Sequence, residues 1–356
     1  MTVPFVKVEV RGSHRAIGRA LGEAARPQVE AAVAYYRENL AGMSEFSFDA
    51  AESLSLRYAA AARRVLPKLV DELEGLAEGA GVPFGALAVL NCGEELTCVG
   101  DPAAHCTTVA MAAAGRVVAA HNEDWYAGDV ANNVLMDVTV PDGTRFLAMS
   151  AAGYLGATGI SSHGIASGAN TVYSGDVRIR VPNMVVRRWV LEARSLPEAV
   201  ERACLPQRAR GSNHLFASAD GSIVDVETSA TAFAVIQAEA HGGGASWTAH
   251  TNHYLDDSMK GHELSTWEGS RRRLARARAL VVDGLARGDD PADIAARTLC
   301  DHDGDPLCIC AHVDESLPPA EREMTCASQV WDLEAMTMDV CAGPPCENPY
   351  RRYRLG

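Results

Sequence analysis

The sequence lacks long hydrophobic runs, and it is poor in positive charge. No stretch of the 356 residues approaches the ~18 uninterrupted apolar residues of a membrane span. The opening residues, MTVPFVKVEVRGSHR, place a charge every few positions and contain no apolar core of a secretion signal. Lys and Arg number 32 against 46 Asp and Glu, a net charge of −14, which disfavours nucleic acid and anionic membranes as partners. We therefore expect a soluble, cytoplasmic protein that binds neither.

Without a secretion signal, the ten cysteines are expected to be mostly thiols. A free cysteine usually behaves as a small buried hydrophobic residue, and this interpretation suits Cys92, Cys98, Cys204 and Cys300. Cys341 and Cys346, in the segment CAGPPC, could instead form a disulfide.

The hydrophobic pattern changes character near residue 106. Before it, the spacing predicts a strand over residues 3–10, followed by amphipathic helices over 13–40 and 54–79 and another that starts at 83. After it, short β-like runs separated by turn signals predict hairpins, with helices over 182–194, 196–203, 270–285 and 292–299. Strands on both sides of a helical block favour a layered α+β fold.

One predicted hairpin carries a candidate nucleophile. The run HCTTVA, residues 105–110, is joined through the Ala113–Gly115 turn to RVVAAHNEDW, residues 116–125. Cys106 opens the first strand, and an Asn-Glu-Asp-Trp cluster closes the second. The hairpin therefore places a thiol across from a polar patch.

Several separated patches, taken in order, resemble a known family. They include CTT at 106–108 and N-x-D-W at 122–125, the glycines after Arg11, the ELEGLAEGAGV run at 72–82, Asn170, the NHY of 252–254, Ser270 with Arg273, the ICAH of 309–312, and Thr325 to Ser328. This order resembles the acyl-CoA:6-aminopenicillanic acid acyltransferase family of N-terminal-nucleophile (Ntn) hydrolases, also known as the isopenicillin N acyltransferase-like or C45 peptidase family. By this resemblance the fold is a four-layer αββα sandwich with a mainly helical N-terminal segment.

The resemblance also implies that the chain is a zymogen that cuts itself. Cleavage would break the bond between His105 and Cys106, leaving residues 1–105 as a helical N-terminal segment and 106–356 as the Ntn-hydrolase core. We expect the two fragments to stay associated as one structural unit. Whether that unit forms homo-oligomers is left open.

Cleavage would have a chemical purpose. A cysteine thiol has a pKa of roughly 8.5, so at neutral pH it needs a base to become a nucleophile. A freed α-amine, with a pKa of about 7.7 to 8.0, can accept that proton, whereas an amide nitrogen within the chain cannot. Cys106 would then supply both the nucleophile and the base, and it would form a thioester with the acyl group of a linear amide.

The resemblance assigns roles to further residues. Asn252 is expected to donate to the oxyanion, Asp124 to orient the α-ammonium group, and Thr108, on the same strand face as Cys106, to bond near the amine. The remaining candidates are expected to shape the substrate site: Asn122, Trp125, Asn170 and Arg322.

Two reactions fit this chemistry. With water as acceptor the enzyme is an amidohydrolase, and with an amine it is an acyltransferase, for which a CoA thioester could be the acyl donor. We expect a small-molecule amide or acyl substrate and no cofactor, and we favour hydrolysis because no clear motif for the CoA phosphates appears. The other alternative is an Ntn-fold protein that only binds a ligand and stays uncut.

A metal site is the main competing interpretation of the chemistry. Cys308, Cys310 and His312 would face one side of a strand and could share a zinc ion. The acidic residues of 301–305 faintly resemble a calcium loop, but the twelfth position is His312 rather than a glutamate. Since the resemblance places a buried strand without metal here, we expect no metal ion.

Overall fold

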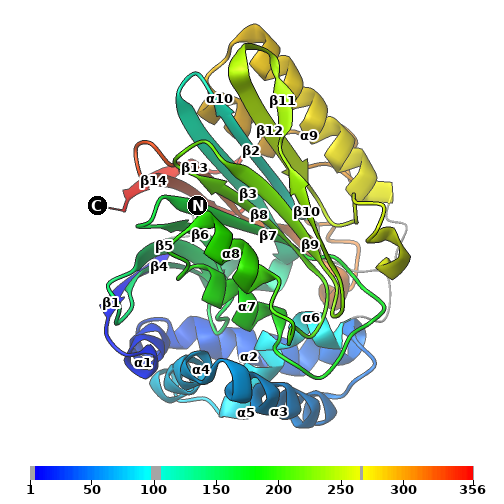
Figure 1. The fold of residues 1–356 in the computed structure, drawn as a ribbon. Coiled ribbons are helices and arrows are strands. Elements are labelled where there is room, and N and C mark those ends of the chain that lie inside the picture. Colours follow the sequence, from blue (N-terminus) through cyan, green and yellow to red (C-terminus); the bar gives the residue numbers. More distant parts are fainter. Residues whose placement is uncertain (1–4, 98–105, 265–267, 356) are drawn as a thin grey trace.

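Two β-sheets lie face to face between two helical layers in the computed structural model of the chain (Figure 1), which describes residues 5–97, 106–264 and 268–355. The first sheet contains, in spatial order, β1 (Val6–Arg11), β4 (Asn133–Thr139), β5 (Arg145–Ala151), β6 (Thr158–Ser161), β7 (Ile165–Asn170), β8 (Ser212–Ser218), β9 (Ile223–Thr228) and β10 (Phe233–Gln237). The second contains β11 (Glu239–His241), β12 (Ala245–His250), β2 (Thr107–Ala113), β3 (Arg116–Tyr126), β13 (Glu323–Asp332), β14 (Thr337–Ala342) and β15 (Arg351–Arg354).

The helices form the two outer layers. One layer contains α1 (His14–Ala24), α2 (Arg26–Met43), α3 (Phe48–Val65), α4 (Pro67–Ala80), α5 (Phe84–Asn91), the short α6 (Gly93–Leu96), α7 (Asn183–Val190) and α8 (Leu196–Ala203). The other contains α9 (Glu268–Arg287) and α10 (Pro291–Leu299).

Three buried clusters separate the four layers. Leu135 and Leu147 of the first sheet pack against Trp331 and Val340 of the second, which closes the space between the sheets. A larger cluster joins the outer face of the first sheet to the helices of the N-terminal segment and to α7 and α8. A third packs Val109 and its neighbours in the second sheet against α9 and α10. The predicted αββα arrangement is therefore confirmed.

The hairpin that carries Cys106 forms as the sequence predicts. Ala114 and Gly115 connect β2 to β3 with φ values of 52° and 76°. Positive φ at both central residues is the geometry of a two-residue turn whose twist matches the strands. The register pairs Thr107 with Asn122, so Cys106 lies next to Glu123 at the open end of the hairpin.

The helices largely follow the predicted pattern. Ser13 caps α1 by accepting a hydrogen bond from the Ala16 amide. The helix expected over 54–79 is two helices, because Pro67 begins the new helix α4. The helix expected over 13–40 is instead two helices, which meet at Ala25, with Pro27 in the first turn of α2, where its missing N–H costs little.

The strands β13, β14 and β15 were not predicted from the sequence. The strand β13 occupies a central position in its sheet, and it buries Ser328 and Gln329 rather than alternating apolar with polar residues. Conversely, the strand expected near Cys310 is wrong, because residues 303–306 form turns and residues 307–310 form bends. The Cys310 amide donates to the carbonyl oxygen of Asp301 at 3.0 Å. The polarity of a segment does not show whether it forms a buried strand when its polar side chains form hydrogen bonds inside the fold.

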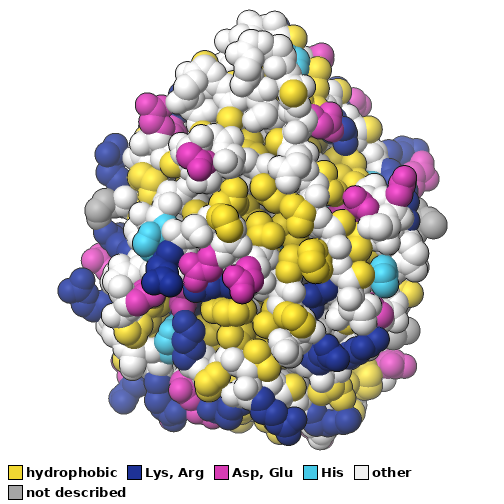
Figure 2. All heavy atoms as spheres, viewed as in Figure 1, with side chains coloured by type: hydrophobic (Ala, Val, Ile, Leu, Met, Phe, Trp, Pro, Cys, Tyr) yellow, Lys and Arg dark blue, Asp and Glu magenta, His cyan; other side chains and the backbone are white. Residues whose placement is uncertain are grey.

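The N-terminal segment is built into the core. The strand β1 pairs in parallel with β4 and so extends the first sheet, while the other strand pairs among the described residues are antiparallel. Figure 2 shows both signs of charge interspersed on one face around a central apolar patch, with Lys and Arg gathered toward the lower helical layer. The excess of acidic residues therefore does not form one acidic surface on this face.

None of the helices in the described part of the chain combines the length and the apolar character that crossing a bilayer requires.

Candidate active site

Cys106 is buried at the entry to β2, with 1% of its surface exposed. Its Sγ lies 3.7 Å from Glu123 Oε1 and 3.8 Å from the carbonyl oxygen of Asp124. Burial, followed by the charges of Glu123 and Asp124, raises the pKa of the Cys106 thiol well above its ordinary value. In the unprocessed chain this sulfur is therefore a neutral thiol rather than a thiolate.

A buried arginine connects Cys106 with Asn252. Arg273 of α9 donates through Nη1 to the carbonyl oxygen of Cys106 at 2.7 Å and to Thr107 Oγ1 at 3.1 Å. Its Nη2 donates to Asn252 Oδ1 at 2.9 Å. The guanidinium thus fixes the position of the Asn252 side chain relative to the main chain at Cys106.

The other contacts of Asn252 determine its orientation. Its backbone N–H donates to Ser270 Oγ at 2.8 Å, and its Nδ2 donates to the carbonyl oxygen of Thr171 at 3.0 Å. Since Oδ1 faces Arg273, the amide cannot be reversed without placing two donors together. The second hydrogen on Nδ2 has no partner among the described residues and is free to donate to a ligand.

Asp124 is a buried carboxyl group on the strand face that looks toward α9. Neither of its oxygens has a hydrogen-bond partner among the described residues. Burial raises its pKa to about 7, although the nearby Arg273 charge and the Thr325 hydroxyl lower it. A group poised near neutral pH and lacking a partner is a frequent feature of catalytic centres.

Thr108 belongs to a chain of polar contacts that ends beside Cys106. Its Oγ1 lies 2.8 Å from His121 Nδ1 and donates to Asn170 Oδ1 at 3.0 Å, and His121 Nε2 lies 3.1 Å from Glu123 Oε2. Glu123 is the residue beside Cys106 Sγ. Thr108 does share the strand face of Cys106, and its hydroxyl is engaged with His121 and Asn170.

The remaining predicted residues lie in different environments. Asn122 points to the other face of β3, where its amide donates to the carbonyl oxygens of Leu299 at 2.9 Å and Ile309 at 3.0 Å. Arg322 donates at 2.8 Å to the carbonyl oxygens of Leu317 and Glu315 in an exposed loop. Neither side chain is brought to Cys106. The predicted cleavage partner His105 lies outside the described residues.

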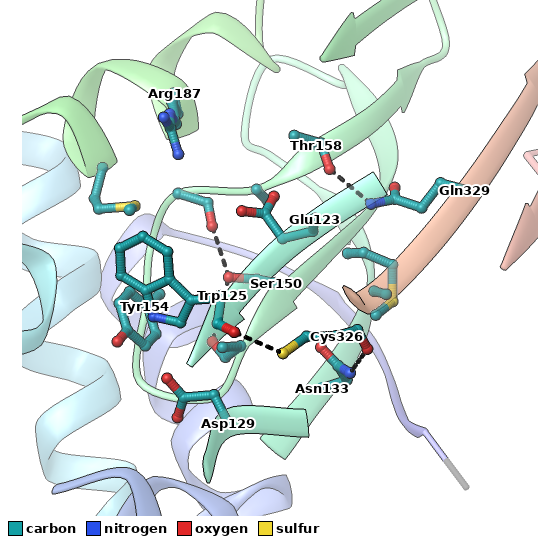
Figure 3. Close-up of a pocket in the computed structure, with 16 residues that line it drawn as sticks. Glu123, Trp125, Asp129, Asn133, Ser150, Tyr154, Thr158, Arg187, Cys326 and Gln329 are labelled. Carbon is teal, nitrogen blue, oxygen red and sulfur yellow. Dashed lines mark hydrogen bonds between the residues drawn. The ribbon is translucent and has the colours of Figure 1, made fainter. Parts of the chain in front are cut away.

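Glu123, which lies beside Cys106 Sγ, also lines a cavity (Figure 3). Its volume, taken as the space open to the centre of a water molecule, is about 50 Å³. Trp125 and Tyr154 form part of its wall, and Trp125 Nε1 donates to Tyr36 Oη at 2.9 Å. Apolar groups supply much of the rest: Met149, Ala151, Ala157, Met184, Cys326 and Ala327.

Arg187 introduces a positive charge at the end of this cavity nearest Glu123. In Figure 3 it extends from α7 toward the cavity, opposite Glu123. It is 4% exposed and forms an ion pair with Glu94 at 2.9 Å, while its Nε has no hydrogen-bond partner among the described residues. The cavity therefore combines an apolar wall with one end that carries charges of both signs.

Four participants had no role assigned from the sequence. In the sequence, Arg273 stands out only as the end of the Ser270–Arg273 patch, yet the three-residue spacing places both side chains on one face of α9, where both contact Asn252. His121 and Glu123 stand two apart in β3, so alternation alone puts them on the face of Cys106. Arg187 left no comparable signal, because its position depends on where α7 packs.

Comparisons with known proteins give consistent matches. The family model described as "Acyl-coenzyme A:6-aminopenicillanic acid acyl-transferase" matches residues 111–347. The "Acyl-coenzyme A:6-aminopenicillanic-acid-acyltransferase 40 kDa form" of Emericella nidulans is 23% identical over 348 residues, which cover 97% of this chain and 94% of that protein.

Two solved structures are similar at low identity. Penicillin V acylase from Agrobacterium tumefaciens matches with a TM-score of 0.43 and 14% identity over 67% of this chain and 82% of its own. A mutant of conjugated bile acid hydrolase from Clostridium perfringens matches with a TM-score of 0.42 and 12% identity, over 70% of this chain and 97% of its own.

Proposed function

The chain belongs to the acyl-coenzyme A:6-aminopenicillanic acid acyltransferase family of Ntn hydrolases, and we propose that it is an amidohydrolase or acyltransferase activated by its own cleavage before Cys106. In this proposal the mature enzyme breaks a linear N-acyl bond through a thioester on Cys106. The observation that carries it is the bridge from Arg273 to both the Cys106 main chain and Asn252.

Cleavage proceeds as an exchange of nitrogen for sulfur. Cys106 Sγ attacks the carbonyl carbon of His105, the bond from that carbon to the Cys106 nitrogen breaks, and the thiol proton ends on that nitrogen. Water then hydrolyses the thioester, which frees the thiol and leaves a carboxylate on His105. Because Arg273 fixes the carbonyl of Cys106, the leaving nitrogen stays close to its own sulfur during these steps.

Turnover uses the groups that cleavage releases. The freed α-amine accepts the thiol proton, the thiolate attacks the substrate carbonyl, and the resulting ammonium protonates the departing amine. Asn252 donates its free N–H to the tetrahedral oxyanion. Asp124, with two unpartnered oxygens in a buried site, is suited to hold the ammonium through charge-assisted hydrogen bonds.

The cavity beyond Glu123 is suited to the acyl part of the substrate. Its wall is largely apolar, and it begins at the residue that touches Cys106 Sγ. An apolar acyl group placed there gains from burial, while polar atoms near the scissile bond remain within reach of Arg187 and Glu123. Water is always available as acceptor, so we favour hydrolysis over transfer to an amine.

Intact-mass measurement on purified protein tests the class of mechanism. We expect two fragments, residues 1–105 and 106–356, from the unaltered chain and one uncut chain from Cys106→Ala. The variant Cys204→Ala is the control, since this partly buried thiol follows α8 and should leave cleavage intact. Turnover by a chain that stays whole, or cleavage of Cys106→Ala, would disprove the proposal.

A competition assay separates the two reactions. Mature protein is incubated with an N-acyl donor and increasing concentrations of amine, and free acid and new amide are measured together. Free acid as the main product at every amine concentration supports the amidohydrolase. Amide formation that outruns hydrolysis at low amine concentration would assign the enzyme as an acyltransferase instead.

A further inference from the structure

We propose that His302, Cys310, His312 and Cys346 bind one zinc ion at a structural site. Their four ligand atoms all lie within 4.8 Å of one another. The two histidine Nε2 atoms are 3.0 Å apart, the two sulfurs are 3.7 Å apart, and Cys346 Sγ is 3.3 Å from His312 Nε2. The residues come from two segments far apart in the sequence, 302–312 and 346.

The spacing matches a tetrahedral zinc site. Zinc bonds of about 2.3 Å to sulfur and about 2.05 Å to nitrogen place two sulfurs about 3.8 Å apart, two nitrogens about 3.3 Å apart and a mixed pair about 3.6 Å apart. The three separations given above agree with these values to within a few tenths of an ångström, and the other three pairs of ligand atoms lie within 4.8 Å. A sulfur separation of 3.7 Å is also far longer than the roughly 2.05 Å of a disulfide bond.

This ligand set differs from the one that the sequence suggested. Cys308 is not a member, because its Sγ lies 3.1 Å from the carbonyl oxygen of Cys310 and 3.9 Å from Asp305 Oδ1. The acidic residue Asp301 is also engaged, in a two-bond ion pair with Arg276 at 3.0 and 2.7 Å. His302 and Cys346 complete the set with Cys310 and His312, and the proposal replaces the expectation of no metal ion.

The chemistry of the four ligands favours zinc. Two thiolates and two imidazoles form the Cys2His2 set, and the charge of the thiolates balances that of the ion. Glu347 Oε1 lies 3.5 Å from His312 Nδ1, on the ring nitrogen opposite the ligand atom, where a carboxylate commonly orients a zinc-binding histidine. Because all four positions are filled by protein, the site is structural rather than catalytic.

The position of the site indicates which parts of the fold the ion would stabilise. It would join the bends of 302–312 to the segment that follows β14. Those bends also contact the catalytic strands, since Asn122 donates to the carbonyl oxygen of Ile309 and the Ala311 amide donates to Thr325 Oγ1 at 2.9 Å. Thr325 pairs across the strands with Asp124. Zinc would therefore stabilise the framework behind Asp124 without touching the substrate.

Metal analysis of the full-length protein tests this proposal. Protein purified without chelators from zinc-supplemented cells should contain about one zinc per chain, as expected for a four-ligand structural site. Cys310→Ser, Cys346→Ser and His302→Ala should each lose most of that zinc. Cys308→Ser is the matched control and should retain it, because its sulfur lies nearby but outside the ligand set. Replacing zinc with cobalt(II) should produce the visible absorption of a tetrahedral thiolate site.

The variant His302→Ala separates loss of zinc from misfolding. The His302 side chain is exposed, so its removal should leave the circular dichroism spectrum unchanged. Removing the ion from the unaltered protein with a chelator should lower its melting temperature, and zinc but not magnesium should restore it. Protein that holds no zinc after reconstitution, zinc retained by Cys346→Ser, or an intact mass showing a Cys310–Cys346 disulfide would each overturn the proposal.

Discussion

At the scale of single residues, the uncut chain holds the Cys106 thiol and the Asp124 carboxyl group in environments that oppose their ionisation. The Cys106 thiol has a raised pKa, and the Asp124 carboxyl is buried without a hydrogen-bond partner among the described residues. Cleavage would change this by adding a basic nitrogen, and then a positive charge, beside both groups. In the proposed mechanism, this carboxyl group is unfavourable in the uncut chain and finds its partner, the α-ammonium group, only after cleavage.

Asn252→Ala should lower kcat by a factor of roughly 10² to 10³, the usual effect of removing one oxyanion donor. KM should change little, because the hydrogen bond forms with the transition state. Steady-state kinetics on fully cleaved protein measures both. The control is Asn348→Ala, which removes an amide that donates to Pro344 near the C-terminus. Equal losses of kcat in the two variants would argue against the assigned role.

Asp124→Asn should stabilise the uncut Cys106→Ala chain at pH 8 while abolishing turnover in the Cys106 enzyme. The folded pKa of Asp124, about 7, exceeds its ordinary value of 3.8, so stability is lost as pH rises between these values. Because asparagine does not ionise, Asp124→Asn should raise the free energy of unfolding only slightly at pH 4 and by on the order of 4 kcal/mol at pH 8.

Urea unfolding at the two pH values measures this difference. Asp257→Asn is the matched control, since the Asp257 side chain is 93% exposed. A stability difference that does not grow between pH 4 and pH 8 would contradict the assigned cause.

At the scale of elements, the contact between α1 and α4 explains why each helix carries two glycines four residues apart. Gly18 and Gly22 of α1 face Gly75 and Gly79 of α4. A Cβ added at any of the four would overlap the backbone of the other helix. The helices therefore approach until main chain touches main chain, which only glycine allows.

Gly22→Ala should destabilise the fold by about 2 to 4 kcal/mol, because the new methyl group meets the backbone of Leu76 and Ala80 and the helices must separate. Urea unfolding of the Cys106→Ala chain measures the change, so that cleavage does not complicate it. Gly261→Ala serves for comparison, since an added Cβ there meets nothing within 4 Å. A change at Gly22 no larger than that at Gly261 would show that the helices can adjust.

At the scale of the whole molecule, the segment that cleavage would release is part of the sandwich. Its strand β1 extends the first sheet, and its helices cover one face of that sheet. A separated segment would leave a sheet edge and a large apolar face in water, which is strongly unfavourable. Cutting one peptide bond before Cys106 does not by itself break these contacts.

The two fragments should therefore migrate as one species in size-exclusion chromatography at neutral pH and separate only in denaturant. Mass spectrometry of the native peak should find both residues 1–105 and residues 106–356. The Cys106→Ala chain provides the reference elution volume. Fragments that separate without denaturant would mean that the interface across the first sheet is weaker than its burial indicates.

By itself, the sequence determined most of the helices, the hairpin of β2 and β3 and the identity of the candidate nucleophile. Apolar spacing and the Ala114–Gly115 turn are local signals, and they placed the hairpin correctly and showed which segments are helical. Helix boundaries were less certain where a break such as Ala25 depends on packing. The ordered patches around Cys106, Asp124 and Asn252 indicated the family, which the family match confirmed.

Only the tertiary structure decided how these residues meet. Arg273 and Cys106 are separated by 167 positions, and no local pattern shows that one holds the main chain of the other. The same holds for His302 and Cys346, because the predicted strand at Cys310 is a series of bends that turns Cys308 away and brings the others together. Side-chain direction follows from the backbone path, and in irregular segments that path is set by long-range contacts.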